Sequence, residues 1–292
     1  MIKAIKQFII KKINFFKMLF DFNDWILIYK LRKNKKLFYM PELKEYFKDS
    51  DFFAFGTGGS VENIDGFEKL KNKNTLFLTT GPIHCYKKYG FVPNMWIVTN
   101  PPSMEKSIIE MQNIDIDFSN TFIFLPSPFS NSKEVKFSSD VIKKFRKIIN
   151  NKAIFVFYEK DWGNGVVTEN YLSDKYPIEN VRGSAVEGTF ISFLYFLGVK
   201  NIFFSGIDMI ETGHFWDRKE CYQDINGKKL NFEDIKSNEE VFKAGKLARQ
   251  IAKDKNLGIY RLEKEETILL DYEYKEFKDA YNMSSDKIYI RR

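Results

Sequence analysis

Short apolar runs alternate with segments of helical spacing along most of this chain. The runs are rich in Phe, Ile and Val, which favour strands, and they occupy residues 52–55, 75–79, 95–99, 121–125, 153–158, 201–205 and 258–262. Between them, apolar residues recur at steps of three and four in segments 103–112, 139–149, 186–197 and 238–255. This alternation predicts an α/β fold, with a mainly parallel sheet covered by helices on both faces.

The beginning of the chain follows a different pattern. In residues 1–20 apolar residues recur every three or four positions, and lysines occupy much of the remaining turn. The lysines interrupt the segment too often for a membrane span, and it lacks the continuous apolar region of a secretory signal. We expect a basic amphipathic helix that either lies on an anionic membrane surface or packs on the domain or on a partner subunit. Residues 1–50 are predicted to form a helical N-terminal extension, and residues 51–292 the main domain.

One internal segment, residues 211–234, has no clear periodicity and is polar with scattered aromatic residues. A loop of this length inside a compact domain is usually either disordered or a lid over a site. We predict a lid-like insertion here.

The amino-acid composition excludes several classes of protein. With 292 residues, of which 44% are hydrophobic, the chain can bury a full core. It has two cysteines far apart in the sequence, Cys85 and Cys221, which argues against a disulfide framework and a structural zinc site and favours the cytoplasm. The net charge of +7 suits an anionic partner, but the basic charge is concentrated near the N-terminus and no nucleic-acid-binding module is visible, so we expect no nucleic acid partner.

A glycine-rich turn follows the first predicted strand of the main domain. In "FGTGGSV" the residues Gly56, Thr57, Gly58, Gly59 and Ser60 lie between strand and helix, where a Rossmann-like fold lets the backbone approach a phosphate. No Gly-Lys-Ser/Thr follows, and Val61 stands where a third glycine would be expected. The turn either binds phosphate or only joins the strand to the next helix.

Small and polar residues also follow other strands. Thr80 and Asn100 follow the second and third strands, and Gly206 and Asp208 follow the sixth. Because parallel strands end at one edge, these residues are expected to share a ligand site. Asn100 precedes two prolines and either presents its amide to a ligand or caps the helix that follows. Asp208 binds a ribose hydroxyl or a cation, or caps a turn.

Residues 51–262 resemble the bacterial sialyltransferases of glycosyltransferase family 42 and the related MptE-like group, which includes motility accessory factors and pterin pyrophosphokinases. The likeness rests on "FGTGGSV", "VTNPPS" and "RGSAVEGTFISFLYFLGVKNIFFSGIDM". The resemblance implies that a cytidine nucleotide is bound by residues of these motifs, namely Gly56, Gly58, Ser60, Asn100, Arg182, Ser184 and Asp208. Arg182 has the forked donors that suit a phosphate, and Gly183 and Ser184 leave space for one.

The chain also departs from that family. Where family 42 has two tyrosines after Ser-Gly-Ile-Asp, this chain has Ile210 and Trp216, and the family's late histidine has no counterpart near residues 236–239. The family's catalytic pair is therefore not carried over. His214, in the predicted lid, matches a histidine of the MptE-like group, and with Asp217 it is a candidate catalytic residue, although a structural role stays open. His84, the other histidine, is expected to be packed or capping.

Two activities remain open at this point. One is a glycosyltransferase that moves a sialic-acid-like sugar from a CMP donor to a cell-surface glycan or lipid-linked oligosaccharide, without a metal cofactor, at the inner membrane face. His214 or Asp217 would then deprotonate the acceptor, and Trp216 would lie near the leaving phosphate. The alternative is a pyrophosphokinase that transfers diphosphate from ATP to a small hydroxymethyl substrate, with Mg²⁺ held by the carboxylates of Asp208, Glu211 and Asp217. The oligomeric state is left open.

Overall fold

The computed structural model of this protein describes residues 22–78, 80–98, 107–111, 114–126, 142–143, 153–158, 186–207, 215, 239–264 and 272–289.

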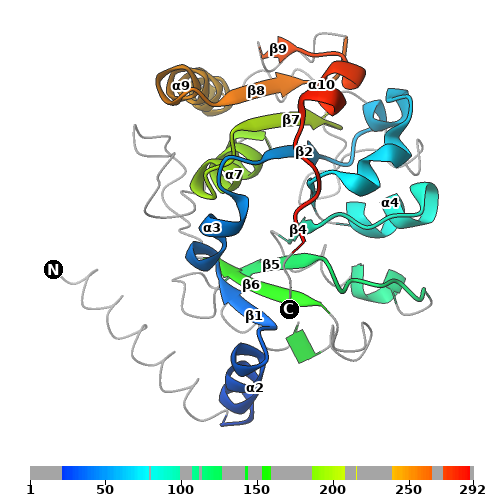
Figure 1. The fold of residues 1–292 in the computed structure, drawn as a ribbon, viewed down its shortest axis with the longest axis vertical. Helices are drawn as coiled ribbons and strands as arrows, with labels where there is room; N and C mark the ends of the chain where they lie inside the picture. Colours follow the sequence, from blue (N-terminus) through cyan, green and yellow to red (C-terminus); the bar gives the residue numbers. More distant parts are fainter. Residues whose placement is uncertain are drawn as a thin grey trace, which may run out of the picture.

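Within these residues the strands form one parallel sheet of nine strands, in the order β1-β6-β5-β4-β3-β2-β7-β8-β9 (Figure 1). The strands are β1 (Leu37–Tyr39), β2 (Asp51–Phe55), β3 (Thr75–Leu78), β4 (Met95–Ile97), β5 (Phe122–Pro126), β6 (Ile154–Tyr158), β7 (Asn201–Ser205), β8 (Gly258–Arg261) and β9 (Glu273–Tyr274). The Rossmann-like, mainly parallel fold expected from the sequence is confirmed.

From β2 onward, the order of the described strands changes direction once, next to β2. From β2 the chain adds β3, β4, β5 and β6 on one side, and it then returns to the other side of β2 to add β7, β8 and β9. β2 and β7 are therefore neighbours, paired in parallel from Asp51↔Asn201 to Phe55↔Ser205. In open α/β sheets, ligands bind beyond the carboxyl ends of the strands at such a switch point.

Helices cover both faces of this sheet, as the alternating pattern predicts. They are α2 (Phe22–Lys33), α3 (Lys44–Phe47), α4 (Gly81–Tyr89), α7 (Ser192–Phe196), α9 (Glu239–Lys255) and α10 (Phe277–Met283), with the 3₁₀ helices η1 (Met40–Leu43), η2 (Gly59–Asn63) and η3 (Phe67–Asn72) and the π-helix η4 (Val186–Ile191). Figure 1 shows α3, α7 and α9 on one side of the strands and α4 on the other.

The side chains of β2 alternate between two cores. Phe52 and Ala54 pack with α3, α7 and α9, whereas Phe53 and Phe55 pack with η2, η3, α4 and α10. All four side chains are fully buried, because β2 is central in a sheet that is covered on both faces. This explains why the strand reads as a continuous apolar run.

Every strand predicted for the main domain is present, with bounds that agree to within two residues. The sheet also contains β1 and β9, which are short edge strands of three and two residues, too short for a periodic pattern to mark them. β1 lies inside the segment assigned to the N-terminal extension. Met40, Leu43 and Phe47 are fully buried, so residues 37–50 belong to the sheet and its core.

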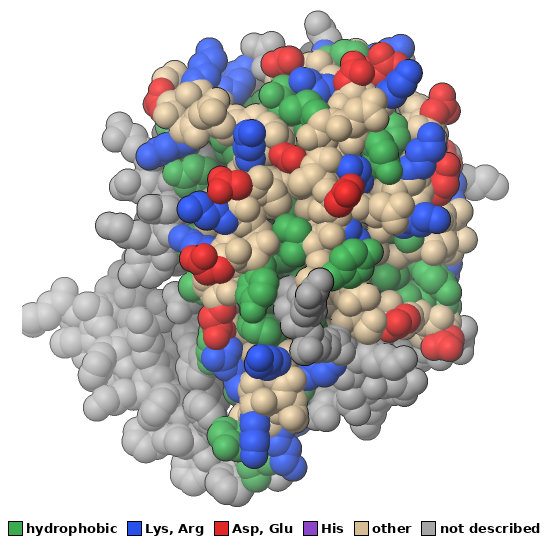
Figure 2. All heavy atoms as spheres, viewed as in Figure 1, with side chains coloured by type: hydrophobic (Ala, Val, Ile, Leu, Met, Phe, Trp, Pro, Cys, Tyr) green, Lys and Arg blue, Asp and Glu red, His purple; other side chains and the backbone are tan. Residues whose placement is uncertain are grey.

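Charged side chains of both signs are interspersed over most of the described surface in the face that Figure 2 presents. Among the residues described, no helix has the length and apolar character that crossing a bilayer requires. Residues 1–20 lie outside the described ranges, so their amphipathic helix stays a prediction.

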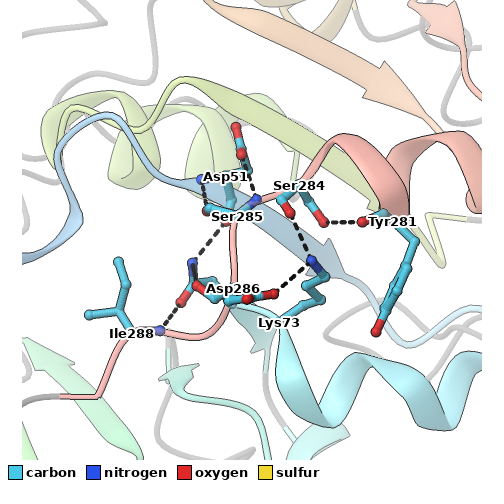
Figure 3. A network of polar contacts seen from close by, with 8 residues as sticks. Asp51, Lys73, Tyr281, Ser284, Ser285, Asp286 and Ile288 are labelled. Carbon is cyan, nitrogen blue, oxygen red and sulfur yellow. Dashed lines mark hydrogen bonds and ion pairs between the residues drawn. The ribbon is translucent and has the colours of Figure 1, made fainter.

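A polar network ties the C-terminal segment to the amino end of β2 and to the turn before β3 (Figure 3). Asp51 at the start of β2 accepts hydrogen bonds from Asn201 Nδ2 at 2.6 Å and from the Ser285 amide at 2.7 Å. The Asp51 amide donates in return to Ser285 Oγ at 3.0 Å. Asn74 Nδ2 donates to the Asp51 carbonyl, and Asn74 Oδ1 accepts from the Ile288 amide.

Lys73, which lies in the turn before β3, binds the same C-terminal segment. Its Nζ donates to the Ser284 carbonyl at 2.7 Å and to Asp286 Oδ1 at 3.1 Å, and it lies 4.7 Å from the ring centroid of Tyr281. The side chain of Lys73 is only 8% exposed, whereas that of Asp286 is 93% exposed. The C-terminal strap, residues 284–288, is therefore held at the amino edge of the sheet, opposite the edge where a ligand is expected.

Candidate functional site

The carboxyl ends of β2, β3, β7 and β8 meet at the switch point. Residues 56–60 follow β2, Thr80 follows β3, Gly206 follows β7, and Leu262 and Glu263 follow β8. Neighbouring strands are parallel and in register here, so these segments share one edge of the sheet. The predicted site residues that the structure describes, Gly56–Ser60, Thr80 and Gly206, are all at this edge.

The glycine-rich turn is locked to the end of β7 by its backbone. The amide of Gly56 donates to the Ser205 carbonyl at 2.9 Å, and that of Gly58 donates to the Gly206 carbonyl at 2.8 Å. A Cβ atom at Gly56 would lie 2.2 Å from the Gly206 carbonyl oxygen, and Gly206 has φ +75°, which favours glycine. The glycines at 56 and 206 therefore let two turns interlock closely.

The close packing of Gly56 on Gly206 limits which backbone amides of the turn can bind a phosphate. The amides of Gly56 and Gly58 already donate to the last residue of β7 and to Gly206, so the described geometry supports the alternative of a tight junction for these two glycines. The segment that follows is the short 3₁₀ helix η2, where a Rossmann phosphate site has a full α-helix. Any phosphate contact must come from other groups at this edge.

Ser60 makes contacts that join three strand ends. Its Oγ donates to Glu263 Oε1 at 3.0 Å and lies 3.5 Å from Ser205 Oγ. The Gly206 amide points at both groups, at 2.8 Å from Glu263 Oε1 and 3.1 Å from Ser60 Oγ. The hydroxyl that the sequence suggested for a phosphate thus binds a carboxyl group.

Glu263 is the functional candidate that the sequence reasoning missed. Burial raises the pKa of its carboxyl, outweighing the hydroxyls of Ser205 and Ser60 and the Glu263 and Gly206 amides, which lower it. Its second oxygen, Oε2, is buried and forms no hydrogen bond with a described residue. The sequence held one signal that could have identified it, because Glu263 directly follows the predicted strand 258–262, which ends at the ligand edge.

Thr80 lies at the amino end of α4, beside the glycine-rich turn. It is buried, and its carbonyl accepts from the Ile83 amide at 3.2 Å, which starts the helix. His84, on the same helix, is also buried, with Nε2 3.1 Å from Glu110 Oε2. The interpretation of His84 as a packed residue is confirmed.

Phe215 is the residue of the predicted lid that the structure describes. Its amide donates to the Thr57 carbonyl at 3.0 Å, and its carbonyl accepts from Lys88 Nζ at 2.8 Å. The ring packs against Phe77 and Tyr89, with centroids 6.4 and 6.3 Å away. Phe215 therefore binds the glycine-rich turn directly.

The remaining predicted site residues lie outside the described residues and stay predictions. They are His214, Asp217, Asn100, Arg182, Gly183, Ser184, Asp208 and Trp216. In the described ranges no group of three or more His, Cys, Asp or Glu side chains is placed to hold a metal ion.

A cavity of about 500 Å³ opens at the opposite, amino edge of the sheet. Lys48, Lys200 and Lys255 line it, near the carboxyl ends of α3, α7 and α9. Lysines at helix carboxyl ends are explained by the helix dipole and the unpaired carbonyls there. We therefore place the candidate ligand site at the switch point.

No protein-family model matches this chain, and a search of curated proteins finds no match.

Proposed function

We propose that this protein is a nucleotide-dependent glycosyltransferase that moves a sialic-acid-like sugar from a CMP donor to a cell-surface glycan. The observation that carries the proposal is the single reversal of strand order between β2 and β7 in an all-parallel sheet. The glycine-rich turn, Gly206 and a buried carboxyl group gather at the carboxyl ends of the strands there. This is where α/β sheets bind nucleotides.

The proposed reaction is a direct displacement. The acceptor hydroxyl forms a bond to the anomeric carbon of the donor sugar, the bond from that carbon to the phosphate oxygen breaks, and CMP leaves with the electron pair. His214 or Asp217 takes the proton of the acceptor hydroxyl. Arg182 stabilises the charge on the departing phosphate, because its forked donors match two phosphate oxygens.

A nucleotide panel tests this proposal. Thermal denaturation of the full chain is measured with CMP, CDP, UMP, AMP and ATP, each with and without Mg²⁺. Saturation at about 100 times Kd stabilises a protein by about 2.7 kcal/mol. For a chain of this size, we expect CMP to raise Tm by about 5–10 °C and the metal to make no difference.

Two results would overturn the proposal. Stabilisation by ATP with Mg²⁺, and not by CMP, would favour the pyrophosphokinase. A panel in which no nucleotide shifts Tm would remove nucleotide binding altogether.

A further inference from the structure

The segment that carries Glu263 is held rigidly at the ligand edge. The Leu262 amide continues the pairing of β8 with β7 by donating to the Phe204 carbonyl at 3.0 Å. The Arg261 guanidinium donates to the Tyr272 and Lys264 carbonyls at 3.0 and 3.2 Å and also to the carbonyl of Glu263. The main chain of Glu263 is thus fixed from both sides, which is the support that a preorganised binding group needs.

The carboxyl group itself is fixed through one oxygen. Oε1 accepts from Ser60 Oγ at 3.0 Å and from the Gly206 amide at 2.8 Å. These donors come from the turns after β2 and β7, the two strands at the switch point. They therefore orient the carboxyl and leave Oε2 as its remaining acceptor.

Oε2 is buried without a hydrogen-bond donor from the described residues. Buried polar atoms in native proteins are nearly always paired, so such an atom calls for a partner. Burial raises the pKa of the carboxyl by more than the surrounding hydroxyls and amides lower it, so these groups compensate its charge only in part. A ligand group that donates a hydrogen bond to Oε2 would compensate it.

The chemistry of a nucleotide limits which of its groups can do this. A phosphate is repelled by a carboxylate, and at neutral pH it is mostly deprotonated and so a poor hydrogen-bond donor. The ribose offers hydroxyl donors, and carboxylates bind ribose hydroxyls in dinucleotide folds beside the glycine-rich turn. Here the acidic residue comes from the end of β8, on the opposite side of the switch point from β3.

We propose that Glu263 Oε2 accepts a hydrogen bond from a ribose hydroxyl of the bound nucleotide and makes the site selective for ribonucleotides. This inference rests on the proposed function, because it requires that the protein binds a nucleotide.

The test pairs a protein change with a ligand change. Affinities of the full chain for CMP, 2′-deoxy-CMP and 3′-deoxy-CMP are measured by calorimetry for the unchanged protein, Glu263→Gln and Glu273→Gln. Glu273 is an exposed glutamate on β9 and controls for the loss of one negative charge. In Glu263→Gln the new side chain would keep an oxygen for Ser60 and Gly206 and replace the acceptor Oε2 with an amide donor.

We expect the unchanged protein to bind CMP about 10- to 100-fold more tightly than one of the deoxy compounds, as for a hydrogen bond to a charged group. Glu263→Gln should weaken CMP binding by a similar factor and reduce the preference to within about twofold. Glu273→Gln should behave as the unchanged protein.

The outcomes separate this inference from the proposed function. If the unchanged protein binds CMP and both deoxy compounds equally, the inference is wrong whatever the variant does, and the proposed function stands. The same holds if Glu263→Gln weakens CMP and its deoxy forms equally. If none of the three ligands binds the unchanged protein, the proposed function fails and the inference with it.

Discussion

At the residue scale, the contact between Ser60 and Glu263 changes the role that we assign to the glycine-rich turn. Ser60 belongs to a glycine-rich turn that is typical of phosphate binding, yet its hydroxyl donates to a carboxyl group 203 positions away. Gly56 and Gly206 have no side chain, and this lets their backbones approach each other closely. A Cβ atom at Gly56 would lie 2.2 Å from the Gly206 carbonyl oxygen. The glycines therefore position the carboxyl group of Glu263.

The burial of Glu263 predicts a dependence of stability on pH. Its pKa is raised in the folded protein, so its contribution to stability is full below the ordinary glutamate pKa and is lost as pH rises through the folded pKa. Glu263→Gln has no such proton to lose. We expect Tm of this variant, relative to the unchanged protein, to increase as pH rises from the ordinary glutamate pKa through the raised pKa of Glu263.

Thermal denaturation of both proteins over that pH range checks this prediction. Glu273→Gln is the control, because it removes one exposed negative charge. A difference in Tm between Glu263→Gln and the unchanged protein that stays constant with pH would contradict the prediction.

At the element scale, the C-terminal strap is held by several polar contacts in addition to the apolar packing of Ile288. Asp51, Lys73 and Asn74 bind its backbone from the amino edge of the sheet. The Lys73–Asp286 ion pair contributes little, because Asp286 is almost fully exposed to water. The bond from Lys73 to the buried Ser284 carbonyl matters more, because its loss leaves a buried acceptor unpaired.

We expect Lys73→Met to lower the free energy of unfolding by about 1–3 kcal/mol. Urea denaturation measures this change, and hydrogen exchange at the Ser285 and Ile288 amides should become faster. Lys71→Met, at an exposed position in η3, is the matched control and should change stability by less than about 0.5 kcal/mol. Equal effects of the two substitutions would show that the strap does not depend on Lys73.

The elements themselves were largely predictable from the sequence. The central strands are apolar on both faces and bounded by polar or glycine residues, and this local signal placed β2, β7 and the others closely. β1, of three residues, gave no such signal, and its place at the sheet edge depends on pairing with β6. The 3₁₀ helix η2 was also not predictable, because the residues after Gly58 are compatible with an ordinary helix.

At the scale of the whole molecule, different features lie at the two edges of the sheet. The switch point and Glu263 lie at the carboxyl edge, and the strap and the lysine-lined cavity lie at the amino edge. The basic segment of residues 1–20 adds a third feature. If the proposed acceptor is lipid-linked, this segment is expected to bring the protein to an anionic membrane surface.

Deletion of residues 1–20 tests that expectation. Each lysine near an anionic surface contributes about 1 kcal/mol, so we expect the deletion to weaken binding to phosphatidylserine-containing vesicles by at least about tenfold. Vesicles of phosphatidylcholine alone are the control and should bind both forms weakly. Aggregation or a change of oligomeric state in the shortened protein, with vesicle binding unchanged, would instead identify the helix as a packing element.

The sequence by itself determined the fold class and which residues follow each strand, because the burial of a strand and the formation of a turn depend on residues that are neighbours in the chain. It placed Gly56–Ser60, Thr80 and Gly206 at one edge for that reason. Only the tertiary structure decided that Gly56 packs on Gly206 and that Ser60 meets Glu263. These contacts join residues far apart in the chain, and they arise from the order in which the strands enter the sheet, which no local pattern of residues encodes.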